Sequence, residues 1–375
     1  MVIFKMTEPI RILHMIGSLN IGGSQSMIIN LHKAIDKTKI QFDYIIDHPS
    51  HLYYEPVIRE LGGRIFVLPS FNGSNFITIR KAWQTFFDEH KEYRILHSHI
   101  RSYASIYLPV AHKAGVKTII HSHSTSNGSG LSAIVKRALQ FPLRYQADSF
   151  FACSKEAGAW LFGKKIVNGK NFHILQNAID CNKYRFNQNT RDEYRKAMNL
   201  TDKKVFIHVG RFHPAKNHLF LLNLFAEIYK KDKKAVLLLV GDGELRSVIE
   251  KKIEELNIQK SVFVLGNRSD VPDLLQSADC FLFPSIWEGL GMVAIEAQAV
   301  GLPCICSTGV PQMVSVVPDL CYFLPTDDMQ KWVDLASKLH PSYFETSNYL
   351  RKSGYDIKVT AKEMMLFYMK NWEVK

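Results

Sequence analysis

The stretch CFLFPSIWEGLGMVAIEAQAVGLPCICS, residues 280–307, decides the fold. It opens and closes on short apolar runs, at 280–285 and 303–307, and a longer helical pattern lies between them. This order is typical of two parallel strands that are joined by a crossover helix. The same alternation recurs in both halves of the 375-residue chain, so we predict an α/β protein.

Working outward, the other apolar runs divide into two series. The first series predicts strands at 11–16, 42–47, 64–68, 94–99, 118–123 and 149–154. The second predicts strands at 205–210, 235–241 and 261–266, followed by the two quoted above. A chain of this length exceeds one ordinary core, so each series predicts a Rossmann-like, doubly wound domain. We expect the strand carboxyl ends of both domains to face a central cleft that binds the ligand.

A polar stretch at 177–197 separates the two series, and we place the linker there. Residues 355–375 predict one amphipathic helix. Periodicity alone does not identify the surface against which this helix packs.

The charge is unevenly distributed along the chain. The net charge is +12, and residues 1–187 carry 23 basic and 12 acidic groups, which is +11, whereas residues 188–375 carry 24 and 23, which is +1. This asymmetry indicates that the first half meets a polyanion or an anionic membrane surface, although solvated lysines that confer solubility would give the same count. A nucleic-acid partner is not expected, because no recognition motif accompanies the charge.

Cysteine spacing and hydropathy indicate the compartment. The six cysteines form no C-x-x-C pair, so we expect reduced core residues rather than a zinc ribbon or a disulfide framework. No run of about 18 apolar residues occurs. We therefore predict a cytoplasmic protein without a spanning helix.

One motif follows the first strand of each series. Gly22 and Gly23 precede a helix, where backbone amides approach a ligand closely and bind anions. Arg211 and Lys216 follow the strand at 205–210, and together they suit a diphosphate, which a guanidinium grips with two hydrogen bonds and an ammonium neutralises.

The quoted stretch carries the third motif. Glu288 and Glu296 stand eight residues apart, one before the helix and one within it. This spacing lets the two carboxylates hold two hydroxylated parts of one extended ligand. The amides of the turn at 289–291 would then lie against its anionic middle.

The pattern G-R-x-x-x-x-K-N at 210–217, followed by P-S-x-x-E-G-L-G-x-x-x-x-E-A-x-A-x-G-x-P at 284–303, resembles the retaining nucleotide-sugar glycosyltransferases of the GT-B fold, glycosyltransferase family 4. The Gly-Gly loop, H-S-H-S at 121–124 and N-A-I-D at 177–180 fall where that family has them.

The resemblance implies a role for each motif. Arg211 and Lys216 would hold the donor diphosphate, and Glu296 would bind the nucleotide ribose. Glu288 would contact hydroxyls of the donor sugar, with His121 beside the transferred sugar. The remaining donor contacts would come from backbone at Gly22, Gly23, Gly289, Leu290 and Gly291.

The resemblance also implies the domain plan and the partners. The N-terminal domain would hold the acceptor and comprise 1–180 with a crossing helix at 356–375, and the donor domain would comprise 181–355. The donor would be a nucleotide-sugar, most often a UDP-sugar. Transfer would retain the anomeric configuration and would need no metal or other cofactor. The acceptor would be a cell-surface glycan or a polyprenyl-diphosphate-linked oligosaccharide at the inner face of the cytoplasmic membrane, where the protein would bind peripherally.

Several alternatives remain at this point. Two H-S-H pairs, at 97–99 and 121–123, bring a metal site into consideration, but no carboxylate or cysteine completes it, so we expect no metal. Asp242-Gly243-Glu244 is interpreted as a helix N-cap rather than a metal-binding D-x-D pair. A nucleotide-sugar epimerase and a non-catalytic partner subunit with this fold are the competing functions.

Overall fold

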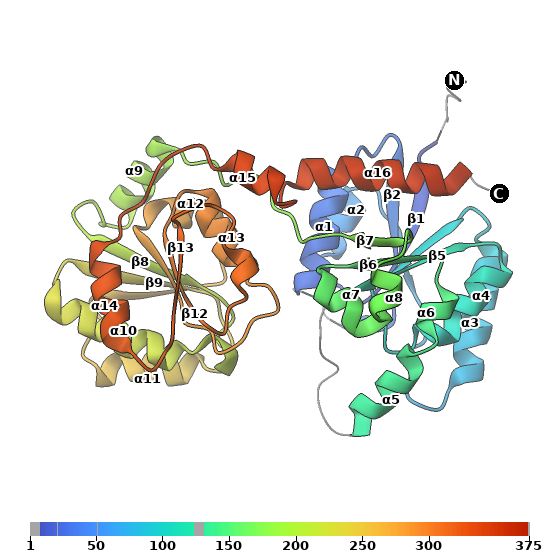
Figure 1. The fold of residues 1–375 in the computed structure, drawn as a ribbon, viewed down its shortest axis with the longest axis horizontal. Helices are drawn as coiled ribbons and strands as arrows, with labels where there is room; N and C mark the ends of the chain where they lie inside the picture. Colours follow the sequence, from blue (N-terminus) through green and yellow to red (C-terminus); the bar gives the residue numbers. More distant parts are fainter. Residues whose placement is uncertain (1–7, 21, 51, 124–130, 374–375) are drawn as a thin grey trace. The chain divides into compact units, whose positions relative to one another are not determined.

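The computed structural model describes residues 8–20, 22–50, 52–123 and 131–373, which form two compact units (Figure 1). Unit 1 comprises Met1–Ile179 with Gly354–Lys375, and unit 2 comprises Asp180–Ser353. The sequence-based boundaries lie one residue later at the first crossing and two residues later at the second. Each unit contains its own parallel sheet, which confirms the predicted fold class.

Unit 1 contains a seven-stranded sheet in the order β3-β2-β1-β4-β5-β6-β7. Its strands are β1 (Ile10–Gly17), β2 (Ile40–Ile46), β3 (Ile65–Val67), β4 (Ile95–Ser98), β5 (Lys117–Ser122), β6 (Ser149–Ala152) and β7 (Phe172–Ile174). Its helices are α1 (Gly23–Ala34), α2 (Glu55–Glu60), α3 (Phe76–Glu89), α4 (Ala104–Lys113), α5 (Leu131–Gln140), α6 (Leu143–Gln146), α7 (Lys155–Phe162), α8 (Lys164–Val167) and α16 (Ile357–Glu373). The sequence analysis missed β7, because a strand of three residues gives almost no periodic signal.

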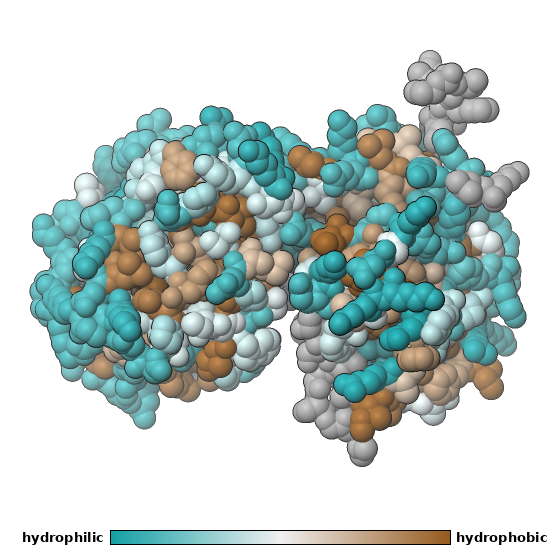
Figure 2. Space-filling view, in the orientation of Figure 1, coloured by the Kyte–Doolittle hydropathy of each residue, from teal (hydrophilic) through white to brown (hydrophobic). Residues whose placement is uncertain are grey.

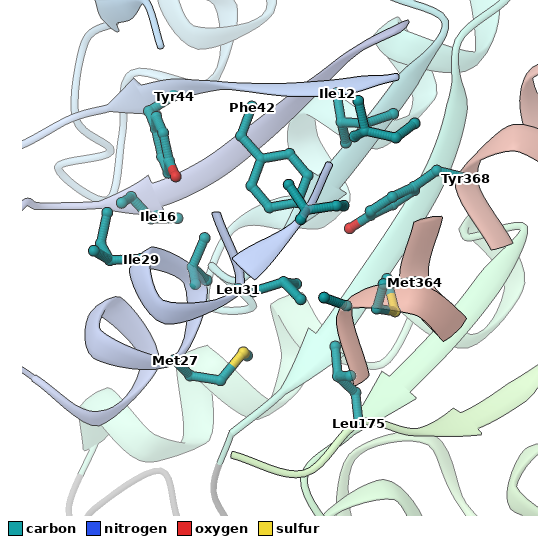
Figure 3. Close-up of a cluster of buried hydrophobic side chains, with 14 of the residues drawn as sticks. Ile12, Ile16, Met27, Ile29, Leu31, Phe42, Tyr44, Leu175, Met364 and Tyr368 are labelled. Atoms are coloured by element: carbon teal, nitrogen blue, oxygen red, sulfur yellow. The ribbon is translucent and has the colours of Figure 1, made fainter. Parts of the chain in front are cut away.

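Helices cover both faces of this sheet, so the inner strands are buried on both faces rather than on alternate residues. Residues on β1 point to the two faces in turn: Ile12 joins the core under α1 and α16, and Leu13 joins the core under α3 and α4. Figure 3 shows the first core, in which Met27 of α1 and Met364 of α16 approach side chains of β1 and β2.

The chain returns to unit 1 at its C-terminal end. Ile179 forms an isolated parallel bridge with Asp356, and its amide donates to the carbonyl of Tyr355 at 2.9 Å. α16 then packs on α1, β1 and β4, where the Tyr368 hydroxyl lies 2.7 Å from Nδ1 of His97. The predicted crossing helix is confirmed.

Unit 2 contains a six-stranded sheet in the order β10-β9-β8-β11-β12-β13. Its strands are β8 (Lys204–Val209), β9 (Ala235–Val240), β10 (Val262–Gly266), β11 (Cys280–Phe283), β12 (Cys304–Ser307) and β13 (Cys321–Leu324). Its helices are α9 (Gln188–Ala197), α10 (His218–Lys231), α11 (Arg246–Glu255), α12 (Val271–Ser277), α13 (Met292–Ala299), α14 (Met329–Lys338) and α15 (Ser347–Lys352), with 3₁₀ turns η1 (Pro214–Lys216) and η2 (Gln312–Val314). β13 was also missed by the sequence analysis.

Strand order reverses once in each sheet. In unit 1 the chain runs outward from β1 in one direction and from β4 in the other, and in unit 2 the same change occurs between β8 and β11. The loops that leave the carboxyl ends of such a strand pair diverge, and this is where open α/β sheets bind ligands. Each unit therefore has its expected ligand position beside these two strands.

None of the helices in the described part of the chain combines the length and the apolar character that a membrane span requires.

Packing of α16 is tested by two substitutions on that helix. Met364 is 3% exposed and Leu366 is 56% exposed. Met364→Ala should lower the free energy of unfolding of unit 1 by about 2–5 kcal/mol, because it leaves a cavity in the core. Leu366→Ala is the control and should change it by less than about 0.5 kcal/mol. Denaturant unfolding measures both, and equal effects of the two substitutions would contradict this packing.

Candidate functional site

The strand-order reversal of unit 2 holds an ion pair. Lys216 ends η1 after β8, and Glu288 lies in the loop after β11. Their side chains are 20% and 12% exposed, and Lys216 Nζ lies 2.5 Å from Glu288 Oε1. The same ammonium stands 5.0 Å from the centre of the Phe283 ring, which adds a cation–π contact. The pair therefore links the two loops that diverge from the centre of the sheet.

Backbone contacts fix the loop that carries Glu288. The amide of Ile286 donates to the carbonyl of Ala215 at 2.7 Å, and the amide of Glu288 donates to the carbonyl of Gly309 at 3.2 Å. A Cβ atom at Gly309 would lie 2.1 Å from the Ile286 carbonyl oxygen, so only glycine fits there. The loops after β8, β11 and β12 thus form one connected scaffold.

The glycine turn ends at the start of α13. Gly291 is the N-cap residue, with φ +87°, and a Cβ atom there would lie 2.9 Å from the Phe283 ring. No side chain caps this helix, so its first amides have no side-chain acceptor. Gly289 has open space at its Cβ position, which leaves room beside the predicted amides of 289–291.

Glu296 lies on α13 and accepts a hydrogen bond from the Tyr184 hydroxyl. Burial raises the pKa of Glu296 to about 7, and the tyrosine bond opposes that shift. The pKa of Tyr184 lies far above its usual range, because the tyrosine is buried and because the Glu296 carboxylate beside it disfavours the ionised form. The sequence analysis did not identify Tyr184, whose only signal was its place in the polar linker.

Arg211 has a different partner from Lys216. Its side chain is 69% exposed, and its guanidinium lies 3.3 Å from Glu244, whose carboxylate is also 3.7 Å from His213. The prediction that Asp242–Glu244 caps a helix is wrong. α11 begins after Leu245 with no side-chain cap, and Asp242 instead pairs with Arg246 at 3.2 Å. The sequence analysis assigned Glu244 to this cap and did not predict its pairing with Arg211.

In unit 1, Gly22 and Gly23 begin α1 beside the carboxyl end of β1. Gly22 is the N-cap residue without a side-chain cap, and its backbone is extended. A Cβ atom at Gly23 would meet nothing within 4 Å. Packing within the described residues therefore does not require Gly23, and space remains for a ligand at this turn.

His121 lies near the end of β5 and is fully buried, and within the described ranges neither ring nitrogen has a hydrogen-bond partner. Burial and neighbouring imidazoles hold its pKa well below the usual histidine range. Ser124 of the H-S-H-S motif lies outside the described residues. His121 belongs to a group that we call the histidine cluster: His14, His97, His99, His121 and His123. His14, on β1, was missed by the sequence analysis, which considered only the two H-S-H pairs.

The structure thus pairs Lys216 with Glu288 and gives Arg211 and Glu296 separate partners. The two glycines and His121 belong to unit 1, and the glutamates and cations belong to unit 2. Their roles toward a ligand remain predictions.

Two family models match the chain. The model for glycosyl transferases group 1 matches residues 190–356, and the model for glycosyltransferase family 4 matches residues 21–183.

Individual proteins give the same picture. EpsF of Bacillus subtilis (strain 168), which is provisionally named a glycosyltransferase, is 34% identical over 312 residues, covering 81% of this chain and 80% of the relative. The Escherichia coli UDP-Gal:alpha-D-GlcNAc-diphosphoundecaprenol alpha-1,3-galactosyltransferase is 27% identical over 228 residues, covering 58% of each chain.

Among solved structures, HepE of Anabaena in complex with UDP superposes with a TM-score of 0.76 at 16% identity, covering 96% of this chain and 100% of HepE. A glycosyltransferase of Rickettsia africae ESF-5 gives 0.77 at 14% identity, covering 99% and 100%. At this identity the likeness shows the fold alone, which is the GT-B architecture.

The raised pKa of Glu296 predicts a pH-dependent stability. The folded chain holds this proton more tightly than the unfolded chain, so the group destabilises the fold progressively as pH rises from about 4.5 through 7. Glu296→Gln removes the charge and keeps an acceptor for Tyr184. We expect the variant to unfold at a higher temperature than the natural protein at pH 8 and at the same temperature at pH 4.5.

Glu254→Gln, an exposed carboxyl on α11, is the control and should change neither value. Thermal unfolding followed by circular dichroism measures all three proteins. A difference for Glu296→Gln that is the same at both pH values would contradict the assignment.

Proposed function

The chain belongs to the glycosyltransferases of group 1 and family 4, and we propose that it transfers a sugar from a UDP-sugar to a polyprenyl-diphosphate-linked glycan during the synthesis of a cell-surface polysaccharide. The E. coli relative supports this donor and acceptor, since its name specifies UDP-Gal and a diphosphoundecaprenol. A second relative, from B. subtilis, is named for teichuronic acid biosynthesis.

The Lys216–Glu288 pair is the observation that carries the proposal. Before a donor binds, the Glu288 carboxylate pairs with the Lys216 ammonium at 2.5 Å. A donor diphosphate brings its own negative charge to Lys216, which frees the Glu288 carboxylate to accept hydrogen bonds from sugar hydroxyls. Arg211 is exposed and held only by a surface ion pair, which is weak enough to exchange for a phosphate.

Glu296 suits the ribose in the same way. Its carboxylate is desolvated and has one identified donor, Tyr184. Two ribose hydroxyls would supply further donors and stabilise the ionised form. The amides of Gly289, Leu290 and Gly291 would lie between the two glutamates and face the diphosphate.

Unit 1 contributes three residues in this proposal. Gly22 and Gly23 approach the donor, and His121 contacts the transferred sugar. The ring of His121 is uncharged at neutral pH, and no residue of the described part of the chain bonds either of its nitrogens. The ring therefore offers one donor and one acceptor to sugar hydroxyls, and its tautomer determines which nitrogen donates. Transfer retains the anomeric configuration, as expected from the family, and the anomeric signals in the NMR spectrum of the product report it.

The reaction proceeds without a metal cofactor. Lys216, Arg211 and the uncapped amides of α13 supply the positive potential that a divalent ion gives to a departing diphosphate in other enzymes. Lys216 is already held in place before the donor binds, by its pair with Glu288.

Unit 1 also has a surface suited to an anionic membrane. On α5, Ile134 and Val135 are 66% and 55% exposed beside the exposed cations Lys136 and Arg137. Figure 2 shows apolar and polar side chains adjoining over this helix. A neighbouring groove of about 740 Å³ is lined by Tyr145 and by further cations, namely Arg144, Lys164, Lys165 and Lys170.

These residues make α5 and the groove a peripheral contact of the kind that binds acidic headgroups, because apolar side chains insert and each cation adds about 1 kcal/mol. Lys113 and Lys117, two further cations of unit 1, lie on α4 and β5 rather than on α5.

Acceptor-dependent release of nucleoside diphosphate tests the function. We expect release from a UDP-sugar, in EDTA, only when a lipid-linked acceptor is present. Lys216→Ala and Arg211→Ala should each lower turnover by about 10²–10³, the cost of losing one preorganised electrostatic contact. Lys251→Ala, an exposed lysine on α11, is the control and should retain full turnover.

Release that requires Mg²⁺ or Mn²⁺ would contradict the metal-free mechanism. Interconversion of the nucleotide-sugar without acceptor would indicate an epimerase, and donor binding without turnover would indicate a non-catalytic subunit.

Co-sedimentation with vesicles tests the membrane contact. Binding should increase with the fraction of anionic lipid and decrease with salt. Lys136→Glu with Arg137→Glu should weaken it by about tenfold or more, since each reversal removes one favourable charge and adds a repulsive one. Lys251→Glu with Lys260→Glu, an equal reversal in unit 2, is the control. Equal binding to neutral vesicles would contradict this surface.

A further inference from the structure

The histidine cluster comes from three neighbouring strands of unit 1. His14 on β1 lies directly opposite His97 on β4. The β4–β5 register, which pairs Ser98 with Ile120, places His99 and His121 side by side one residue later. Since residues two apart on a strand share a face, the five rings gather on one side of the sheet, at its ligand-binding edge.

The rings contact one another closely. His14 Nδ1 lies 3.1 Å from His99 Nε2, and His99 Nδ1 lies 2.8 Å from His123 Nε2. The ring centres of His121 and His123 are 4.0 Å apart. Five imidazoles in mutual contact are an unusual way to fill the interior of a sheet edge, where apolar side chains would pack at lower cost.

Among the residues that the structure describes, several nitrogens in this cluster have no hydrogen-bond partner. They are Nε2 of His14, Nε2 of His97 and both nitrogens of His121, all fully buried. An unpaired buried polar atom costs free energy, so the arrangement at His121 implies a ligand that uses one of its nitrogens.

The donor atoms that gather here determine the chemistry of that ligand, because all five side chains offer imidazole nitrogens. Neutral imidazole presents a lone pair to a metal ion and has no charge with which to attract an anion. A transition metal such as zinc fits these nitrogen donors, whereas Mg²⁺ and Ca²⁺ prefer oxygen ligands.

We propose that His99, His121 and His123 bind a first-row divalent transition metal ion such as Zn²⁺. One nitrogen from each lies within 4.8 Å of the others, and His123 is partly exposed at the edge of the cluster, which gives an ion access. Three histidines with an open fourth position form a familiar zinc-binding set. At a metal–nitrogen distance of about 2.0–2.1 Å the nitrogens stand about 3.3 Å apart, so the 2.8 Å contact needs only a small adjustment.

His14 has a separate part in this site. Its Nδ1 faces Nε2 of His99, so when His99 binds the ion through Nδ1, His14 accepts the hydrogen bond that fixes the tautomer. His97 is held by Tyr368 of α16, and its ring packs against the other rings of the cluster. Each of the five histidines then has a defined role.

The metal acts on transfer as an inhibitor in this scheme, and this part rests on the proposed function. An ion on His121 removes a nitrogen that would otherwise contact the sugar. Zinc therefore should lower transfer, and EDTA should restore it. Failure of this effect with intact metal binding would indicate a different role for His121 and would leave the site itself unaffected.

Metal binding is measured directly, without donor or acceptor, on the full chain lacking a polyhistidine tag. Co²⁺ added to the protein should give the visible absorption of a tetrahedral site, saturating at one equivalent, and Zn²⁺ should displace it. His99→Gln should abolish this signal, and His14→Gln should weaken binding by about 10–100-fold, the usual effect of losing a ligand's hydrogen-bond partner. His340→Gln, an exposed histidine in unit 2, is the matched control.

Zn²⁺ should also raise the unfolding temperature of the natural protein and of His340→Gln but not of His99→Gln. If His99→Gln does not fold, His123→Gln at the partly exposed edge provides the same comparison. Absence of saturable binding, or a signal that survives both substitutions, would overturn the proposal. So would binding that is lost on Cys321→Ser, since Cys306 and Cys321 lie with their sulfurs 3.7 Å apart in unit 2.

Discussion

The ion pair between Lys216 and Glu288 is the interaction on which the candidate donor site depends. It forms where the strand order of unit 2 reverses, so its partners come from loops that would otherwise diverge. The glycine at 309 lets three of these loops approach one another, and no larger residue fits there. The pair also keeps a cation and a carboxylate oriented before any ligand binds. A diphosphate next to a sugar is complementary to this arrangement, because one part of such a ligand takes the cation and the other takes the carboxylate.

Desolvation determines the properties of the other candidate groups. It raises the pKa of Glu296 on one unit and keeps the histidine cluster neutral on the other. Among the described residues, both nitrogens of His121 lack a hydrogen-bond partner, and Tyr184 is the donor identified for Glu296. Glu296 suits hydroxyl donors, and the cluster suits a metal ion. The two candidate sites are thus built by the same physical means and differ in the atoms that they present.

Most of the fold followed from the sequence, because long apolar runs separated by helical patterns define parallel strands with little ambiguity. The strands at 172–174 and 321–324 were too short to give such a pattern. The motif spacing led to Lys216 and Glu288, since both follow strands that are central in a doubly wound sheet. Tyr184, Glu244 and His14 could not be found in this way, because their partners are distant in sequence and depend on strand order. The helix cap assigned to Asp242 failed for a local reason: its carboxylate pairs with Arg246, four residues later in the chain.

The most direct test compares the binding of UDP with that of the UDP-sugar that supports turnover, by calorimetry, in the natural protein, Lys216→Met and Glu288→Gln. If Lys216 binds the diphosphate and Glu288 binds the sugar, Lys216→Met will raise both Kd values by similar factors. Glu288→Gln will raise the Kd of the UDP-sugar while leaving that of UDP unchanged or lower, because it frees the Lys216 ammonium. Two variants that weaken both ligands equally, or that weaken neither, would contradict this division of roles.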